Sequence, residues 1–367
     1  MDLIPTFNSV TDVESYVSRA ISHEFLGGAS VRFDANSSDQ FNSIGSRCIL
    51  DRASVLNIDP QKLVEPILKK LADDRFTSER GFLNFSDNHN PGWILTKEHC
   101  FIPQNLSIYI FDDRLSTLAR MRLSLMATLQ TYLFDKNIQL HKNLVGESTI
   151  DQLVQTQPAD QHINILCGHE GLSPNLFNKV IKAPARAQGK LSFQVVSKPY
   201  LQTKIISWSD DYLEKICVDK ATLLSAAFYY SMPIYASDLD PLSCFLDENA
   251  NLFCFGNRLL SKIRSLIEIG DDSQSAPKIS IAQATNSVTW PVALSLKLLP
   301  LRLQAAICKG DVFAFTQGVY QLLTCAERIL NTPDFRVVIK NRKLTPIDQF
   351  IVNRLVNQLD LIFNYEP

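Results

Sequence analysis

The sequence lacks an excess of positive charge, a long apolar run and closely paired cysteines. Its 36 lysines and arginines against 38 aspartates and glutamates give a net charge of −2 and a pI near 6.3. The net charge therefore does not indicate a nucleic-acid partner, and any basic surface that binds one must be local. No apolar run is long enough to cross a bilayer, and Asp2 and Pro5 interrupt a secretory signal pattern. We expect a cytoplasmic protein with no membrane partner.

The cysteines form no C-x-x-C pair. Eight are present, at positions 48, 100, 167, 217, 244, 254, 308 and 325, mostly inside apolar helical runs. Buried free thiols in a reducing cytosol are expected ahead of disulfides or zinc sites. His99 beside Cys100 does not change this, because a metal site needs two more ligands that the sequence does not place. We expect no metal ion and no cofactor.

With 367 residues, 46% of them apolar and 20% charged, the chain has room for about two or three globular domains. Residues 9–104 have the pattern of a small α/β domain. Apolar residues recur at helical spacing in three segments, 9–25, 46–56 and 60–72. Gly27 and Gly28 are predicted to end the first helix. Short strands are predicted at 31–33 and 81–85.

Residues 106–205 alternate between strand and helix patterns. Alternating and β-branched residues predict strands at 106–111, 138–140, 162–167 and 189–196. Apolar stripes predict helices over 115–134 and 150–155. An order of strand, helix, strand, helix, strand favours a right-handed parallel sheet.

One stretch of this region has residue types that suit catalysis. Cys167-Gly-His-Glu-Gly171 follows a predicted strand, where α/β folds bind ligands. Cys167 could be a nucleophile with His169 as its base, since residues two apart can meet. No third group that would orient the histidine is visible, and a turn after a strand accounts for the same residues. We assign no catalytic residue.

The last third of the chain has helical periodicity. Its first helix has apolar residues at steps of three and four: Phe253, Phe255, Leu259, Leu260, Ile263 and Leu266. Later helical segments are 299–307, 312–330 and 345–363. The last should begin with Thr345 as its cap, Pro346 in its first position and Asp348 in its first turn. The fold class expected for the whole chain is α/β plus all-α.

Several segments resemble arginyl-tRNA synthetases in the same order along the chain. Residues 240–266, an acidic, Asn-containing loop that runs into an aromatic-rich helix, resemble the start of their DALR anticodon-binding domain, and the later helical segments look like its next helices. Gly81-Phe-Leu-Asn-Phe and the helices before it resemble their N-terminal additional domain, which touches the corner of tRNA in that family. The resemblance implies an additional-domain-like α/β domain over 1–104, a reduced Rossmann-like region over 105–210 and a DALR-type helical bundle over 211–367.

The motifs with which class I synthetases bind ATP are missing. These enzymes place His-x-Gly-His after their first strand, where backbone donors and imidazoles meet the phosphates. The corresponding stretch here starts at Arg114 and reads Arg-Leu-Ser-Thr-Leu-Ala-Arg-Met-Arg, without glycine or histidine. A Lys-Met-Ser-Lys-Ser loop is also absent, and Gln188-Gly-Lys-Leu-Ser-Phe has only one lysine. We expect no enzymatic activity.

Basic and aromatic residues of the helical part are candidates for contacts with an anticodon stem-loop. One group lies on a single helix: Arg258, Lys262 and Arg264, of which the first two share a face. The other precedes the last helix: Arg336, Lys340, Arg342 and Lys343. Tyr320, Phe253 and Phe255 are candidates for stacking on bases. An ordinary solvated face for the charges, and core positions for the phenylalanines, are the alternatives.

The domain order resembles the non-synthetase relatives of arginyl-tRNA synthetase, the DALR anticodon-binding-domain-containing proteins. The resemblance implies a non-catalytic adaptor that binds arginine isoacceptors of tRNA. In animals such a relative presents these tRNAs to a 3-methylcytosine methyltransferase. Two alternatives stay open: an arginyl-tRNA synthetase fragment that aminoacylates together with another chain, and a protein-interaction scaffold without RNA binding.

Overall fold

The computed structural model describes residues 6–21, 24–27, 31–35, 43–87, 90–98, 106–111, 129, 162–168, 191–196, 227–228, 252–266, 279–309, 312–333, 335–336 and 344–363. The chain divides into two compact units. The first comprises Met1–His99, Arg264–Pro300 and Thr324–Gln358, and the second comprises Cys100–Ile263, Leu301–Leu323 and Leu359–Pro367. The first unit therefore combines the N-terminal part with segments of the C-terminal helices. The three domain boundaries inferred from the sequence stay a prediction.

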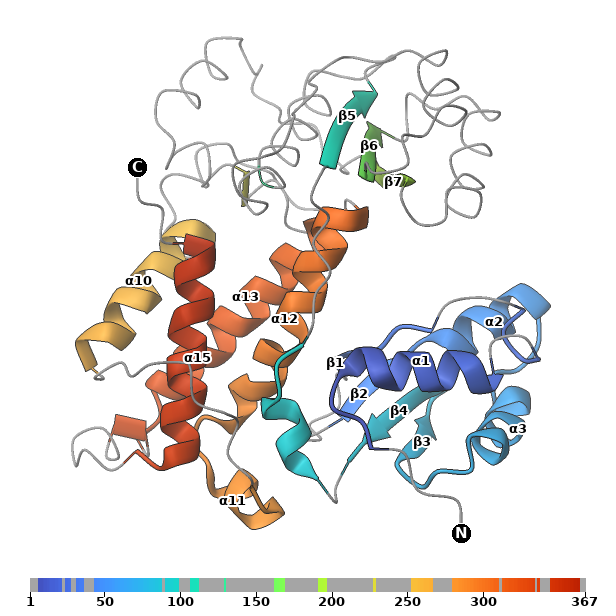
Figure 1. The fold of residues 1–367 in the computed structure, drawn as a ribbon, viewed down its shortest axis with the longest axis horizontal. Helices are drawn as coiled ribbons and strands as arrows, with labels where there is room; N and C mark the ends of the chain where they lie inside the picture. Colours follow the sequence, from blue (N-terminus) through green and yellow to red (C-terminus); the bar gives the residue numbers. More distant parts are fainter. Residues whose placement is uncertain are drawn as a thin grey trace, which may run out of the picture. The chain divides into compact units, whose positions relative to one another are not determined.

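The N-terminal module, residues 6–98, is a small α/β structure (Figure 1). Its helices are α1 (Val10–Ile21), α2 (Cys48–Leu56), α3 (Gln61–Leu71) and the short 3-10 helix η1 (Pro91–Leu95). Its strands are β1 (Asp34–Ala35), β2 (Ser43–Ser46), β3 (Phe76–Glu79) and β4 (Phe82–Ser86). The strands form one antiparallel sheet in the order β1-β2-β4-β3.

The core of this module follows from the apolar spacing of α1 and from an aromatic cluster. Val10, Val13, Val17 and Ile21 are all fully buried, one per turn of the helix. Phe85 lies at the centre of the cluster, with ring centroids of Phe7 at 5.3 Å, Phe76 at 5.1 Å and Trp93 at 5.5 Å. Edge-on and tilted contacts at these separations are favourable for aromatic rings.

One detail of this module agrees with the sequence prediction and one differs from it. Helix α1 is described over Val10–Ile21, and the Phe25 N–H donates to Ile21 O at 2.9 Å, so helical hydrogen bonding reaches the predicted end near residue 25. The strand expected at 31–33 is instead β1 at Asp34–Ala35, although Val31 and Phe33 are buried. Burial of alternate side chains does not require ladder hydrogen bonds, so the apolar pattern misplaced the strand.

The parallel sheet predicted for the middle region is confirmed. Strands β5 (Leu106–Phe111), β6 (His162–Gly168) and β7 (Leu191–Val196) pair in that order, and both pairs are parallel. The strand predicted at 138–140 and the helix at 150–155 lie outside the described residues. Of the helix predicted over 115–134, only Leu129 is described, and it is helical and buried.

The C-terminal part is helical. Its helices are α10 (Leu252–Leu266), α11 (Ile281–Asn286), α12 (Trp290–Lys309), α13 (Val312–Leu330) and α15 (Pro346–Phe363). Helix α12 begins well before the predicted start at 299, because it accommodates Pro300 in its interior. The predicted cap of the last helix is confirmed: the Asp348 N–H donates to Thr345 Oγ1. No helix in the described ranges is long and apolar enough to span a bilayer.

Aromatic rings form the core of the described part of the second unit. The Phe228, Phe253 and Phe363 ring centroids lie 5.6–6.0 Å from one another. Gly256 on α10 permits this packing, since a Cβ there would lie 2.3 Å from the Phe363 ring. Phe253 and Phe255 are 6% and 5% exposed. Burial makes both rings core residues, and the stacking role considered for them from the sequence is wrong.

Candidate nucleic-acid interface

Helix α10 presents three basic residues on its exposed face. Arg258, Lys262 and Arg264 are all exposed, whereas Leu259, Leu260 and Ile263 between them are buried. At about 100° per residue, Lys262 lies about 40° from Arg258, whereas Arg264 lies about 120° from Arg258 in the other direction, at the edge of the exposed face. The predicted shared face of Arg258 and Lys262 is therefore present, and Arg264 faces away from it.

The Arg258 guanidinium is held over an aromatic ring. Its Cζ lies 5.4 Å from the centroid of the Phe255 ring, one turn earlier on α10. A guanidinium stacked on a ring gives up less conformational freedom when it binds a phosphate, because part of its geometry is already set. Arg258 is thus better prepared for an anionic partner than a freely rotating side chain would be.

The remaining predicted contact residues are only partly described. Tyr320 on α13 is 41% exposed, which suits a ring available for stacking. Arg336, after α13, is also exposed. Lys340, Arg342 and Lys343 lie outside the described residues. Among the described candidates, Arg258 and Lys262 lie on a shared face of α10.

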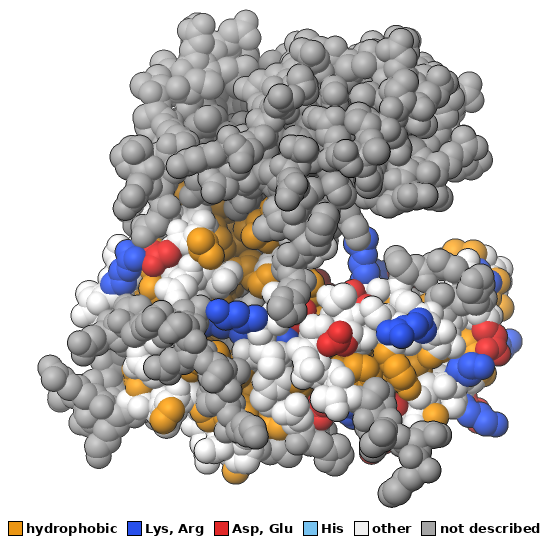
Figure 2. Space-filling model, in the orientation of Figure 1, with side chains coloured by type: hydrophobic (Ala, Val, Ile, Leu, Met, Phe, Trp, Pro, Cys, Tyr) orange, Lys and Arg blue, Asp and Glu red, His pale blue; other side chains and the backbone are white. Residues whose placement is uncertain are grey.

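Two further exposed lysines lie on α3 of the N-terminal module and were missed by the sequence analysis. Lys62 and Lys69 are seven residues apart and lie on one side of the helix. The neighbouring Lys70 pairs with Glu24 at 3.1 Å. The i, i+7 spacing within the predicted helix 60–72 was the available signal. Figure 2 shows lysines and arginines in small groups on the face it presents, and not as one broad basic patch.

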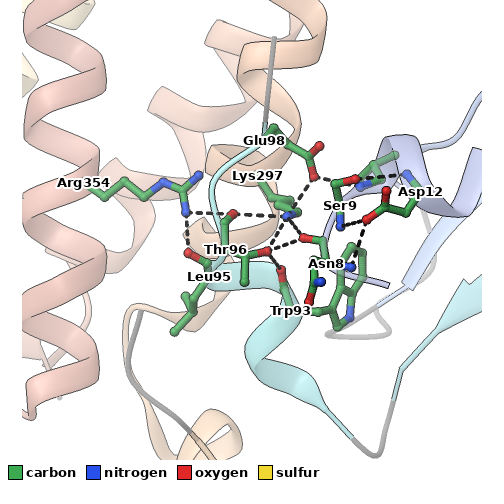
Figure 3. Close-up of polar contacts among 10 residues, drawn as sticks. Asn8, Ser9, Asp12, Trp93, Leu95, Thr96, Glu98, Lys297 and Arg354 are labelled. Carbon is green, nitrogen blue, oxygen red and sulfur yellow. Dashed lines mark hydrogen bonds and ion pairs between the residues drawn. The ribbon is translucent and has the colours of Figure 1, made fainter. Parts of the chain in front are cut away.

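Lys297 is the centre of a buried polar cluster in the first unit (Figure 3). Its ammonium group lies 2.8 Å from Glu98 Oε1 and donates to Asn8 O at 3.0 Å, Thr96 O at 3.1 Å and Thr96 Oγ1 at 2.8 Å. Both side chains of the ion pair are 0% exposed. Burial lowers the pKa of Lys297, and the charge and hydrogen bond of Glu98 offset this in part.

A second cation from another helix reaches the same segment. Arg354 on α15 is buried and donates from Nη1 to Leu95 O at 2.8 Å and to Thr96 O at 3.4 Å. Glu98 Oε1 also accepts from the Val10 N–H at 2.8 Å, at the start of α1. We call Lys297, Arg354, Glu98 and the backbone of residues 95–96 the linker clamp. No sequence motif predicted the linker clamp, since a lone lysine in the apolar run of α12 has no partner nearby in sequence.

The comparison with solved structures agrees with this architecture. Neither a protein-family model nor a curated protein matches the sequence. A solved structure does: Thermus thermophilus arginyl-tRNA synthetase, with a TM-score of 0.55 and 10% sequence identity, covering 96% of this chain and 97% of that chain. The chain has an arginyl-tRNA synthetase-like fold. At this identity the match establishes the fold alone, and activity must be argued from the residues.

Within the arginyl-tRNA synthetase-like fold, the catalytic alternative at Cys167 stays untested. Cys167 pairs with Phe111 and Val195 near the carboxyl ends of the parallel strands, but its side chain and His169 lie outside what the structure describes. The same holds for His99 and Cys100. Among the described residues, no group of three or more His, Cys, Asp or Glu could hold a metal ion.

The described thiols are less buried than expected. Cys48, Cys254 and Cys325 form no disulfide and are half-buried. Desolvation raises the pKa of Cys48 and of Cys325. Their thiols are therefore weak nucleophiles at neutral pH, which does not favour a redox role for either.

Proposed function

We propose that this chain is a tRNA-binding protein that does not aminoacylate. The observation that carries the proposal is the arginyl-tRNA synthetase-like fold over 96% of the chain. The exposed basic residues of α10, with Arg258 stacked on Phe255, supply phosphate-binding chemistry on that fold. Because the net charge is −2, binding must depend on such local groups.

The absence of catalysis is argued from the sequence after β5. A class I synthetase needs histidine and glycine there to meet the ATP phosphates, and the stretch from Arg114 has neither. The Lys-Met-Ser-Lys-Ser loop is missing as well. The sequence therefore lacks the two motifs with which class I synthetases stabilise the charge that develops on the phosphates during amino-acid activation.

The specific role that we propose is an adaptor for arginine isoacceptors of tRNA, which it presents to a tRNA-modifying enzyme such as a 3-methylcytosine methyltransferase. This role is supported by the resemblance to non-synthetase DALR proteins. The tRNA contacts are assigned to Arg258, Lys262, Arg264, Tyr320 and Arg336, together with Lys340, Arg342 and Lys343.

A gel shift with unfractionated tRNA, followed by sequencing of the bound fraction, tests the proposal. Arginine isoacceptors should be enriched, and the affinity should fall steeply between 50 and 200 mM salt, by about 10³-fold if six phosphates are contacted. Enrichment of other tRNAs would overturn the specificity, and no RNA binding at low salt would favour a protein-interaction scaffold. ATP–pyrophosphate exchange that depends on arginine would instead show a catalytic synthetase fragment.

A further inference from the structure

The linker clamp connects three separate parts of the first unit through one small polar cluster. Residues 95–98 leave the N-terminal module at the end of η1. Lys297 of α12 and Arg354 of α15 both donate to the backbone of this segment. Lys297 also binds Asn8 O, just before α1. Two helices distant in sequence thus hold the segments at which the module begins and ends.

The clamp has little freedom to rearrange. Lys297 and Glu98 are completely buried, and moving either one would leave a charge without its partner away from water. The carbonyls of Leu95 and Thr96 accept from two cations, so shifting the segment would also break charge-assisted hydrogen bonds. Lys297 Nζ lies 5.6 Å from the Trp93 ring centroid, which adds a contact with the core of the module. These contacts therefore fasten the N-terminal module to residues 290–300 of α12 and residues 346–358 of α15, all within the first unit.

Exposed basic residues occur in both of the parts that the clamp joins. Lys62 and Lys69 are on α3 of the N-terminal module, and Arg336 follows α13 in the helical part of the same unit. Two weak anion-binding surfaces held in a fixed geometry bind a ligand that spans them more tightly than either surface does alone. The gain for linked sites is about 10²–10⁴ in affinity, and it becomes smaller when their relative orientation is free, because the two sites must then be ordered on binding.

We propose that Lys297 and Arg354 are positioning residues for RNA binding. They touch no RNA, but they hold the N-terminal module against helices α12 and α15 so that one tRNA engages both parts at once. This inference rests on the proposed function, because it needs a tRNA ligand. It goes further because it gives Lys297 and Arg354, which are buried, a role in positioning the two parts of the protein that bind the same tRNA.

The test compares two RNAs on full-length protein: an arginine tRNA transcript and the isolated anticodon stem-loop of the same tRNA. The main variant is Lys297→Met combined with Glu98→Gln, which removes the ion pair without leaving a buried charge and keeps an acceptor for the Val10 N–H. Its affinity for whole tRNA should fall at least tenfold. This loss is part of the roughly 10²- to 10⁴-fold gain in affinity that binding at two linked sites provides. Its affinity for the stem-loop should stay within about twofold of the wild type.

Arg354 supplies a second pair of variants. Arg354→Met should show the same selective loss for whole tRNA, and Arg354→Lys, which retains a charged donor, should restore part of the affinity. Lys70→Met is the matched control, since it removes a lysine from an exposed pair with Glu24. Faster hydrogen exchange at the Val10 amide in the double variant would report release of the clamp in the absence of RNA.

Each outcome separates this inference from the proposed function. If the wild type binds neither RNA, the proposed function fails. If the wild type binds both but the variants weaken both by the same factor, or weaken neither, the positioning role is overturned and tRNA binding stands. Equal affinity of the wild type for whole tRNA and for the stem-loop would also overturn it, because no bivalent gain would exist.

Discussion

Lys297 and Lys262 carry the same ammonium group on two long helices, in opposite surroundings. Lys297 on α12 is fully buried and binds Glu98 and three backbone or hydroxyl oxygens. Lys262 on α10 is exposed, one turn from Arg258. A buried cation must be paired to be tolerated, so its identity is dictated by the fold. An exposed cation is solvated by water whatever its partners are, so the fold does not dictate its identity in the same way.

The difference separates residues that define the shape of the protein from residues that contact a partner. Arginine shows the same division: Arg354 is buried against the backbone of Leu95, whereas Arg258 lies exposed over Phe255. Substitutions at the buried set should change stability, and substitutions at the exposed set should change binding. The following predictions test that division.

The largest effect is expected for Lys297→Met. The substitution leaves the Glu98 carboxylate buried without its cation, which costs about 3–5 kcal/mol of unfolding free energy. Urea denaturation followed by circular dichroism measures it. Lys70→Met, which breaks the exposed pair with Glu24, should cost no more than about 1 kcal/mol. Similar losses for the two variants would contradict the distinction between buried and exposed cations.

Asp348→Ala should be the next most damaging. The buried Asp348 Oδ1 accepts from the Ser287 hydroxyl at 2.6 Å, the Thr289 hydroxyl at 2.8 Å and the Thr289 N–H at 3.1 Å. Loss of these bonds to a charged acceptor should cost about 3 kcal/mol. Asp51→Ala, at an exposed carboxylate near Arg47, is the control and should cost less than about 0.5 kcal/mol in the same denaturation assay. A change below 1 kcal/mol for Asp348→Ala would contradict the account.

Charge reversal of Arg258 and Lys262 together should cost no more than about 1 kcal/mol of unfolding free energy, since the contacts of exposed charged side chains, including that of Arg258 with Phe255, are weak. Affinity for arginine tRNA should fall by about tenfold or more, and the slope of log K against log salt should become shallower by about 2. Filter binding over a salt series measures both quantities. An unchanged slope would remove these residues from the interface.

The smallest effect is expected on the N-terminal module. Reversing the charge of Lys62 and Lys69 should lower the affinity for whole tRNA by about tenfold and leave the affinity for the anticodon stem-loop unchanged. Fluorescence anisotropy with the two labelled RNAs makes the comparison. A matching loss for the stem-loop would show that α3 acts on the RNA only through general charge.

The sequence predicted those features that depend on local patterns. The apolar stripe of α10 and the Thr345 cap of α15 are encoded within a few residues, and both are present. The parallel pairing of β5, β6 and β7 followed from the order of strand and helix patterns. The fold resemblance to arginyl-tRNA synthetase, stated from helices and motifs in order, agrees with the structural match.

Features that depend on distant residues were missed. Strands β2 and β3 are only four residues long and exist because β4 pairs with each of them. Lys297 and Glu98 are far apart in sequence, so no spacing rule reveals their ion pair. Of the candidate site, helical spacing predicted that Arg258 and Lys262 share a face of α10. Arg264 lies at the other edge of the exposed face.

Equilibrium binding of an arginine tRNA transcript to the full-length protein, titrated at several salt concentrations, tests the central claim most directly. The account predicts saturable binding at low salt that weakens as the salt concentration rises. The slope of log K against log salt should correspond to several phosphate contacts, and it should be shallower for the variant with Arg258 and Lys262 charge-reversed. No saturable binding at low salt, or binding of equal strength at every salt concentration, would contradict it.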